Sequence, residues 1–323
     1  CTNSVFKCHS YNFKIYNFDQ SSIHWIMSYL GERSQIVQVE ASTSSELQCG
    51  DHAAPQGSVL GGLLHVINSN DFPACHEEGD SIVYVDDDSD IVHHKDPATL
   101  RDMIEREARN SASWLRDNRL CVAADKSKLL ICGTKALKAS KASPEMMIEV
   151  EGETILESES EKLLGLVINN QLTWKHHLYG DNSNQGLIPQ LSSRIGIMKL
   201  LSKFMSREKI KYFANGIFYS KLSYGLAVFG NVFNLDKSKE GSFTKTDNHR
   251  LQVLQNKLNR VLINADYKTP TSELIAATNS LSIQQLIAYQ TAVMAYKITQ
   301  SQKPQYLYQK LQVHKSVHNL RGR

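Results

Sequence analysis

Short apolar runs alternate with polar turns through the middle of the chain, and apolar residues recur at helical spacing through its last part. Residues 82–85 are β-branched or aromatic, four aspartates occur within residues 86–90, and residues 91–92 are apolar again. This order predicts a β-hairpin with acidic residues at its tip. After about residue 185, leucine, isoleucine and methionine recur every three or four positions, the spacing of amphipathic helices. The pattern therefore predicts an α+β protein with antiparallel hairpins first and helices after them.

Capping and turn signals predict where other elements begin and end. Asp96 followed by Pro97 is typical of a helix start, because the acid caps the first turn and proline fits its first position. Gly152 predicts the turn of a hairpin over residues 148–155, and Ser282 with Gln285 forms a capping-box pattern. We further expect strands over residues 36–41, 46–49, 129–132 and 163–168, a helix capped by Ser21 and Ser22 and ended by Gly31, a helix after Ser58, and a loop over residues 231–248.

Composition places the chain among soluble globular proteins. It has 323 residues, of which 41% are hydrophobic and 21% charged, and this length is sufficient for two domains. No apolar run approaches the ~20 residues needed to span a bilayer, and the sequence shows no signal peptide. Because the chain begins at Cys1, we expect a fragment of a longer protein. We expect it in the cytoplasm and nucleus, with no membrane partner.

Cysteine and histidine spacing indicates no structural metal framework. The six cysteines contain no C-x-x-C pair, which argues against a zinc finger or knuckle, and they are too few for a disulfide scaffold. We therefore expect reduced and mostly buried thiols. The histidine pairs at residues 93–94 and 176–177 fall where strands meet polar loops or helices, and we expect surface histidines there.

Charge is distributed unevenly along the chain. Residues 1–100 contain 4 basic and 14 acidic side chains, a net charge of −10, and residues 101–180 contain 12 of each. Residues 181–323 contain 20 basic and 7 acidic side chains, a net charge of +13. A basic second half beside an acidic centre is typical of a protein that binds a polyanion with one part and cations with another.

The acidic tip of the central hairpin has two interpretations. Acid-rich turns are usually no more than solvated turns. Alternatively, Asp86 and Asp87 meet at the tip and repel each other, and Mg²⁺ relieves that repulsion with its preference for oxygen ligands. Such a site performs two-metal phosphoryl transfer, in which one ion activates a hydroxyl and the other neutralises the leaving phosphate. We expect Asp88 and Asp90 to be solvated acids of the hairpin.

Four segments decide between these interpretations. Tyr84-Val85-Asp86-Asp87 resembles the (Phe/Tyr)-x-Asp-Asp box of reverse transcriptases, and residues 54–61 (Ala-Pro-Gln-Gly-Ser-Val-Leu-Gly) resemble their Pro-Gln-Gly-Ser segment. Residues 114–127 and residues 162–177 resemble the next two motifs of the same enzymes. All four follow the order and spacing of non-LTR (LINE-type, jockey-like) retrotransposons. The chain resembles a reverse transcriptase of that family that is truncated at its amino terminus.

The resemblance implies a fold and a domain order. It implies a right-hand polymerase palm, an antiparallel sheet with packed helices, over residues 1–178. An α-helical thumb-like region follows over residues 179–235, and a basic helical carboxyl-terminal region over residues 236–323. The fingers, which normally precede the palm, are largely missing.

The resemblance also implies the site and its reaction. RNA-directed DNA polymerases bind an RNA template, a DNA primer and deoxynucleotides, and transfer a nucleotide to the primer 3′-hydroxyl with two Mg²⁺ ions. The implied metal ligands are Asp86 and Asp87, and Lys126 is the implied proton donor to pyrophosphate. The residues implied in nucleotide and template binding are Pro55, Gln56, Gly57, Ser58 and Tyr84.

One departure from the family bears on activity. These enzymes need a third carboxylate on an earlier palm strand, and the corresponding residues of this chain, 1–5, are Cys-Thr-Asn-Ser-Val. Loss of that ligand lowers metal affinity and charge neutralisation, so we expect this chain alone to be inactive. The alternative is a non-catalytic, degenerate remnant that at most binds nucleic acid. A Ca²⁺-binding loop is disfavoured, because the Asp-x-Asp-x-Asp-Gly pattern with a trailing glutamate is absent.

Overall fold

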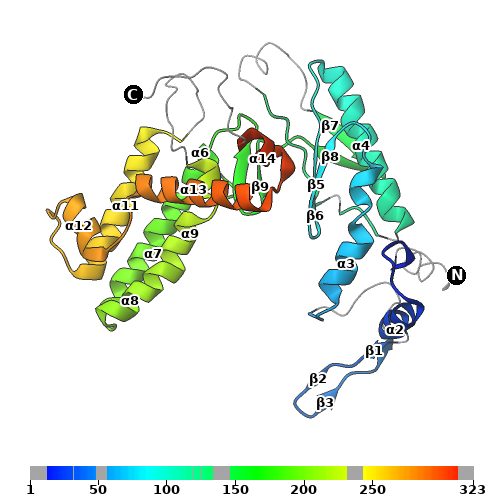
Figure 1. Cartoon of the computed structure of the whole chain (residues 1–323), viewed down its shortest axis with the longest axis horizontal. Coiled ribbons are helices and arrows are strands. Elements are labelled where there is room, and N and C mark those ends of the chain that lie inside the picture. Colours follow the sequence, from blue (N-terminus) through cyan, green and yellow to red (C-terminus); the bar gives the residue numbers. More distant parts are fainter. Residues whose placement is uncertain are drawn as a thin grey trace. The chain divides into compact units, whose positions relative to one another are not determined.

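The computed structural model describes residues 13–31, 33–48, 57–118, 120–123, 125–133, 146–230 and 243–311. They form a mixed α+β protein in which the antiparallel hairpins precede most of the helices, as the sequence pattern predicts (Figure 1). Each sheet within these ranges has two strands. None of the helices in this described part has both the length and the apolar character that crossing a membrane requires.

Two compact units divide the described residues, and each is considered by itself. The first contains the described residues up to Leu129 together with residues 146–157. The second contains residues 130–133 and the described residues from Ser158 onward. The acidic hairpin belongs to the first unit, and the basic helices belong to the second.

The acidic hairpin forms as predicted. Strand β5 (Asp80–Tyr84) pairs antiparallel with strand β6 (Asp87–Ile91). Tyr84 lies opposite Asp87 and Ser81 lies opposite Asp90, so two residues, Val85 and Asp86, make the turn. Helix α3 (Gly61–Ser69) precedes the hairpin, and the 3₁₀ helix η1 (Phe72–Cys75) leads from α3 into β5.

Helix α4 (Pro97–Asp117) follows the hairpin and begins as its sequence predicts. Asp96 is its N-cap and accepts a hydrogen bond from the Thr99 backbone N–H at 2.9 Å. The helix packs against η1 and against strand β7 (Met147–Val150). Phe72 of η1 meets Trp114 of α4 edge to face, with ring centroids 4.9 Å apart. These contacts place α4 beside the polypeptide that enters the acidic hairpin.

Two other hairpins and one helix complete the first unit. Strand β7 pairs with β8 (Glu153–Leu156) around Gly152, as predicted. A hairpin also forms near the strands predicted over residues 36–41 and 46–49, but its turn lies at residues 40–41, inside the first predicted strand. In it, β1 (Ser34–Gln35) pairs with β4 (Leu47–Gln48), and β2 (Gln38–Val39) pairs with β3 (Ser42–Thr43). Helix α2 (Gln20–Leu30) ends at Gly31 as predicted, but Asp19 caps it instead of Ser21 and Ser22, because the Asp19 carboxylate accepts the Ser22 N–H.

One predicted strand of the first unit is wrong. Residues 129–132 form a single bridge, Leu129 to Glu157, and no strand. The apolar run is present in the sequence, but a strand forms only where a neighbouring segment pairs with several consecutive residues. The structure supplies that partner at one position only.

The second unit begins with another hairpin. Strand β9 (Ser160–Leu163) pairs with β10 (Leu166–Asn169), which corrects the prediction of one continuous strand over residues 163–168. Leu164 and Gly165 both have positive φ and reverse the chain at the point where a strand was expected. The Tyr224 hydroxyl donates to the Leu164 carbonyl and fixes this turn against the helices.

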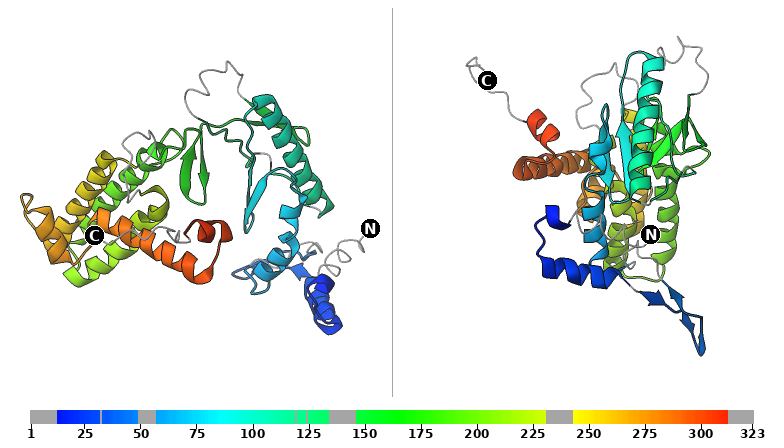
Figure 2. Two further views of the ribbon diagram at one scale, coloured as in Figure 1. Left: turned by 45° about the horizontal axis from the view of Figure 1, so that its top comes forward. Right: turned by 90° about the vertical axis from the view of Figure 1, so that its right-hand side faces the viewer.

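Helices form the rest of the second unit (Figures 1 and 2). Helix α11 begins at Lys245, three residues before the end of the loop predicted over residues 231–248, because Thr244 and Asp247 form a capping box. Residues 231–242 of that predicted loop lie outside the described residues. Helix α13 begins with the capping box that its sequence predicts. The helical elements are α6 (Lys175–Tyr179), α7 (Leu187–Leu201), α8 (Arg207–Ala214), the π-helical turn η2 (Asn215–Tyr219), α9 (Ser220–Ser223), α10 (Leu226–Phe229), α11 (Lys245–Ile263), α12 (Thr271–Thr278), α13 (Ile283–Ser301) and α14 (Gln305–Leu311).

A large apolar core holds these helices together. Helix α11 packs against α7, α8, α12 and α13, and its leucines Leu251 and Leu258 are fully buried. Phe218 and Phe229 are also fully buried in the same cluster. The first unit has a much smaller cluster, in which Phe13 and three residues of α2 meet side chains of α3. Burial of apolar area is the main source of stability, so the core around α11 is what stabilises the helical unit.

Candidate functional site

The tip of the acidic hairpin has an unusual backbone conformation. Val85 has φ 60°, in the left-handed region that a β-branched residue rarely adopts. The carbonyl oxygen of Val85 lies 2.8 Å from Nε2 of His65, a residue of helix α3. Such strain persists only where surrounding contacts hold it, and this hydrogen bond supplies one of them. Helix α3 thereby fixes the turn that contains Asp86.

The register of the hairpin assigns its acids to two faces. Residues that lie opposite each other in an antiparallel pair share a face, and successive residues alternate between faces. Asp87 pairs with Tyr84, and both are exposed on one face. Asp88 and Asp90 share the other face with their partners on β5. The structure therefore separates Asp87 from Asp88, although the two are adjacent in sequence.

The second face of the hairpin meets a buried histidine. His76, which caps the end of η1, places Nε2 3.1 Å from Oδ1 of Asp90 and Nδ1 3.2 Å from Oε2 of Glu107 on α4. The side chains of His76 and Glu107 are each 2% exposed, and that of Asp90 is 26% exposed. Glu107 also accepts the backbone N–H groups of Glu77 and Glu78, the latter at 2.7 Å. The four elements η1, β5, β6 and α4 meet at this cluster.

The electrostatics of the cluster differ from those of a solvated turn. Burial and, to a lesser extent, the Asp88 carboxylate raise the pKa of the Asp90 carboxyl to about 6, although His76 opposes both effects. Burial together with Asp90 and Asp88 raises the pKa of the Cys75 thiol to about 11. Asp90 is therefore only partly a solvated acid of the hairpin, which corrects that expectation, whereas Asp88 is exposed.

The other residues implied by the resemblance are placed as follows. Gly57 has φ 78°, and the Ser58 hydroxyl accepts the N–H of Gly61, the first residue of helix α3, at 3.0 Å. Lys126 is exposed and lies in a turn, where its backbone N–H donates a hydrogen bond to the Ala123 carbonyl at 2.9 Å. Tyr84 is 60% exposed. Pro55 and Gln56, like the Cys-Thr-Asn-Ser-Val start of the chain, lie outside the described residues.

Within the described ranges, three side chains that could bind one metal ion come together at the cluster around His76, which is called the histidine cluster below. His76, Asp88 and Asp90 place one ligand atom each within 4.8 Å of one another, and this is the one such group found in that part of the chain. Asp86 and Asp87 belong to no group of this kind there. The tip therefore offers Mg²⁺ two carboxylates without the third that the resemblance requires.

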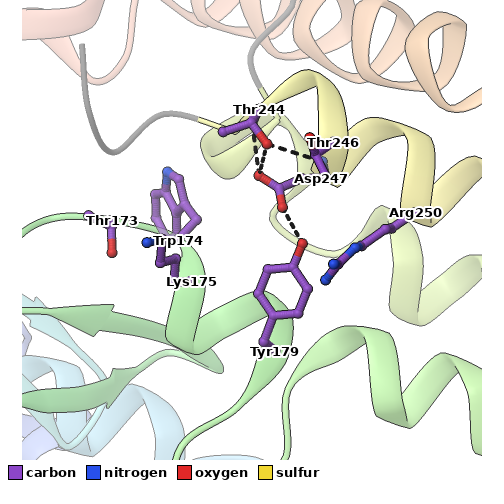
Figure 3. A pocket seen from close by; sticks show the side chains of 8 residues that line it. All are labelled: Thr173, Trp174, Lys175, Tyr179, Thr244, Thr246, Asp247 and Arg250. Atoms are coloured by element: carbon purple, nitrogen blue, oxygen red, sulfur yellow. Dashed lines mark hydrogen bonds between the residues drawn. The ribbon is translucent and has the colours of Figure 1, made fainter.

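The second unit contains a separate polar pocket, which Figure 3 shows from close by. Its volume is about 350 Å³. Asp247, at the start of α11, accepts hydrogen bonds from the Thr244 backbone at 2.8 Å and from the Tyr179 hydroxyl. The pocket is lined by Thr173, Trp174, Lys175, Tyr179, Thr244, Thr246, Asp247 and Arg250.

The pocket contains two cationic side chains and two aromatic rings. The Arg250 guanidinium lies over the Tyr179 ring, 4.9 Å from its centroid, and Lys175 lies next to Trp174 at the start of α6. Burial and Asp247 raise the pKa of the Tyr179 hydroxyl, which keeps it protonated and donating. The Asp247 carboxylate accepts hydrogen bonds from Thr244 and Tyr179, and Arg250 lies beside Tyr179 (Figure 3).

Behind this pocket lies a histidine that the sequence placed on the surface. His177 is 6% exposed, so that prediction is wrong for this residue. Its ring lies 4.9 Å from the Phe229 ring, and Nδ1 lies 3.4 Å from the Val167 N–H, which donates to it. Burial, and to a lesser extent Lys221, lowers the pKa of His177 to about 4, so the ring is neutral at pH 7. The expectation of mostly buried thiols is also wrong for the described cysteines, because Cys121 and Cys132 are exposed and Cys75 is half-buried. Cys1, Cys8 and Cys49 lie outside the described residues.

No family model, curated protein or solved structure matches this chain. The functional interpretation therefore depends on the motifs in the sequence and on the geometry of these two sites.

Sequence reasoning missed His76 and Glu107. Both are single residues without a motif around them. One signal was available: Glu107 follows Met103 by four positions and Ile104 by three, so it falls on the apolar stripe of a predicted helix. An acid in such a stripe is rarely buried unless it has a partner. The partner, 31 residues earlier in the chain, has no local signature.

Proposed function

We propose that the chain is the palm and thumb part of a non-LTR retrotransposon reverse transcriptase. The ancestral reaction is attack of a primer 3′-hydroxyl on the α-phosphate of a deoxynucleotide, directed by an RNA template, with pyrophosphate as the leaving group. The observation that supports this most is the hairpin, which has Tyr84 and Asp87 as its last pair and Val85-Asp86 as its turn. The box that resembles the catalytic motif is thus displayed at a fixed, exposed tip.

Within this proposal, Asp86 and Asp87 are the metal ligands and Lys126 is the proton donor. Gln56, together with its neighbours Pro55, Gly57 and Ser58, positions the nucleotide and template, and Tyr84 lies beneath the primer terminus. Two carboxylates supply oxygen ligands of the kind that Mg²⁺ prefers, but a two-metal site needs further charge. We therefore propose that this chain by itself does not extend a primer.

Primer extension on an RNA template with Mg²⁺ tests this proposal. The wild-type chain and Asp86→Asn are both expected to give no product above a no-protein control. Extension by the wild type that disappears in Asp86→Asn would keep the family assignment and overturn the inactivity of this chain. Extension that persists in Asp86→Asn would contradict the assignment of Asp86 as a metal ligand.

A second candidate function is nucleic-acid binding by the helical unit. The pocket of the second unit favours it, because Lys175 and Arg250 can contact phosphate oxygens while Trp174 offers an aromatic face to a base. The net charge of +13 over residues 181–323 adds long-range attraction for a polyanion. A remnant without catalysis would retain this property.

The double variant Lys175→Ala/Arg250→Ala tests the pocket. It is expected to bind a primer–template duplex about 10-fold more weakly and to lower the slope of log affinity against log salt by about 2, since each phosphate contact contributes about 0.9. Fluorescence anisotropy over a series of salt concentrations measures both quantities.

The matched control for this experiment is Lys209→Ala/Lys211→Ala. It removes the same charge from exposed positions of α8 that do not line the pocket. An equal loss of affinity and slope in both double variants would assign the binding to net charge and would remove the pocket from the proposal.

A further inference from the structure

The histidine cluster presents an electrostatic problem. Nδ1 of His76 faces Oε2 of Glu107, an oxygen that already accepts the Glu77 N–H at 3.3 Å. An ionised carboxylate only accepts hydrogen bonds, so Nδ1 must hold a proton and donate it. Nε2, the other ring nitrogen, lies 3.1 Å from Oδ1 of Asp90. When that nitrogen is unprotonated, it and the carboxylate oxygen repel at this distance unless a cation lies between them.

The same nitrogen is buried, and its 3.1 Å contact with Asp90 does not have the geometry of a hydrogen bond. A second carboxylate, that of Asp88, adds negative charge next to it, and the Ser81 hydroxyl holds Asp88 through a 2.8 Å hydrogen bond to Oδ1. A buried imidazole nitrogen that lies near two carboxylates without a hydrogen bond to either, together with those carboxylates, is a ligand set for a metal ion. Because it includes imidazole, this set suits a transition metal better than Mg²⁺ or Ca²⁺.

We propose that His76, Asp88 and Asp90 form a binding site for a divalent transition-metal ion, with Zn²⁺ as its reference occupant. Three protein ligands with one position left for water is a common arrangement for Zn²⁺. Ligand atoms bound at about 2.0–2.2 Å to a tetrahedral ion lie roughly 3.3–3.6 Å apart. The His76 and Asp90 atoms are 3.1 Å apart, and the three ligand atoms lie within 4.8 Å of one another, so Asp88 would move closer when the ion binds. The site differs from the Asp86–Asp87 tip in both ligands and face.

Glu107 positions the histidine for this role. Metal-binding histidines usually donate their second ring N–H to a carboxylate, which fixes the tautomer and the orientation of the ring. Glu107 accepts from Nδ1 and is itself oriented by the Glu77 and Glu78 N–H groups. The exposed carboxylate of Asp88 gives the ion a path from solvent, since the His76 and Glu107 side chains are covered.

Metal titration of the full chain tests the proposal. Chelator-buffered Zn²⁺, followed by calorimetry, is expected to give one bound ion per chain, and Co²⁺ is expected to give visible d–d bands without a thiolate charge-transfer band. His76→Ala is expected to weaken Zn²⁺ binding by at least about 100-fold, and Asp88→Asn by at least about 10-fold. Asp88 is exposed, so the folding of Asp88→Asn is not at issue.

Two further variants complete the experiment. Asp80→Asn removes an exposed acid from the other face of the same hairpin and is expected to leave Zn²⁺ affinity within about twofold. Glu107→Gln is expected to weaken Zn²⁺ binding about 10-fold while all three ligands remain. No binding by the wild type would mean that a proton alone fills the position between His76 and Asp90, and the metal site would be wrong. Binding that survives His76→Ala, or a thiolate band from Co²⁺, would overturn it as well.

Discussion

Glu107→Ala is expected to destabilise the first unit by about 3–5 kcal/mol, because it leaves several buried donors without an acceptor. Glu107 is 1% exposed and accepts the N–H groups of Glu77 and Glu78 as well as Nδ1 of His76. Alanine cannot accept any of these bonds, and water cannot readily replace the carboxylate at a buried position. The loss includes the two amides that end η1 and lead into β5.

Hydrogen exchange followed by mass spectrometry measures this effect within the first unit. Peptides that cover residues 76–91 are expected to exchange faster in Glu107→Ala than in wild type. Glu107→Gln retains one acceptor oxygen and is expected to lose only about 1–2 kcal/mol. The control, Glu105→Ala, removes a surface ion pair of the same helix, Arg101 to Glu105 at 3.1 Å, and is expected to change stability by less than about 0.5 kcal/mol. Equal effects of Glu107→Ala and Glu105→Ala would show that the cluster does not hold the hairpin.

Phe229→Ala is expected to destabilise the helical unit by about 3–5 kcal/mol, the range for removal of a buried phenylalanine. Phe229 is 1% exposed at the end of α10. Its ring meets those of His177, Trp174 and Phe243 at centroid distances of 4.9, 6.1 and 6.2 Å. The substitution leaves a cavity between α10, α6 and the start of α11, and these helices are joined by few other aromatic contacts in the described part.

Chemical denaturation and local hydrogen exchange measure the effect. Backbone amides in peptides from α6 and α11 are expected to exchange faster, including those of the residues in these helices that line the pocket. Phe204→Ala is the control, because Phe204 is 79% exposed and its removal is expected to cost less than about 0.5 kcal/mol. A small effect of Phe229→Ala would show that α10 is only loosely attached to the core.

The Asp86–Asp87 tip and the His76 cluster lie on the same hairpin but bear on two different functions. The Asp86–Asp87 tip bears on ancestry and catalysis, whereas the His76 cluster concerns a metal of a different kind on the opposite face of the same hairpin. Zn²⁺ binding without primer extension would support an inactive chain whose hairpin is still held by a metal. Primer extension without Zn²⁺ binding would support an active chain that holds no metal at the His76 cluster.

Local sequence signals determined much of the fold. The hairpin around Asp86 follows from a β-branched run, an acidic turn and a second apolar position, all within twelve residues. The starts of α4 and α13 follow from Asp96-Pro97 and from the Ser282–Gln285 capping box, because a cap and its backbone partners lie within one helical turn. Signals of this range can be recognised without knowledge of the rest of the chain.

Only the tertiary structure decided features that depend on distant partners. A run such as residues 129–132 becomes a strand only if another segment pairs along it, and the sequence does not show whether one does. His177 is buried because Phe229, more than fifty residues later, covers it. Asp88 and Asp90 face His76 because of two features: the hairpin register, which places both acids on one face, and the packing of η1 against α4. By itself the sequence determined the hairpins around Asp86 and Gly152, the caps of α4 and α13 and the motif at the tip, since these depend on neighbours in the chain. The histidine cluster joins residues up to 31 positions apart, and only the packed structure specifies their contact.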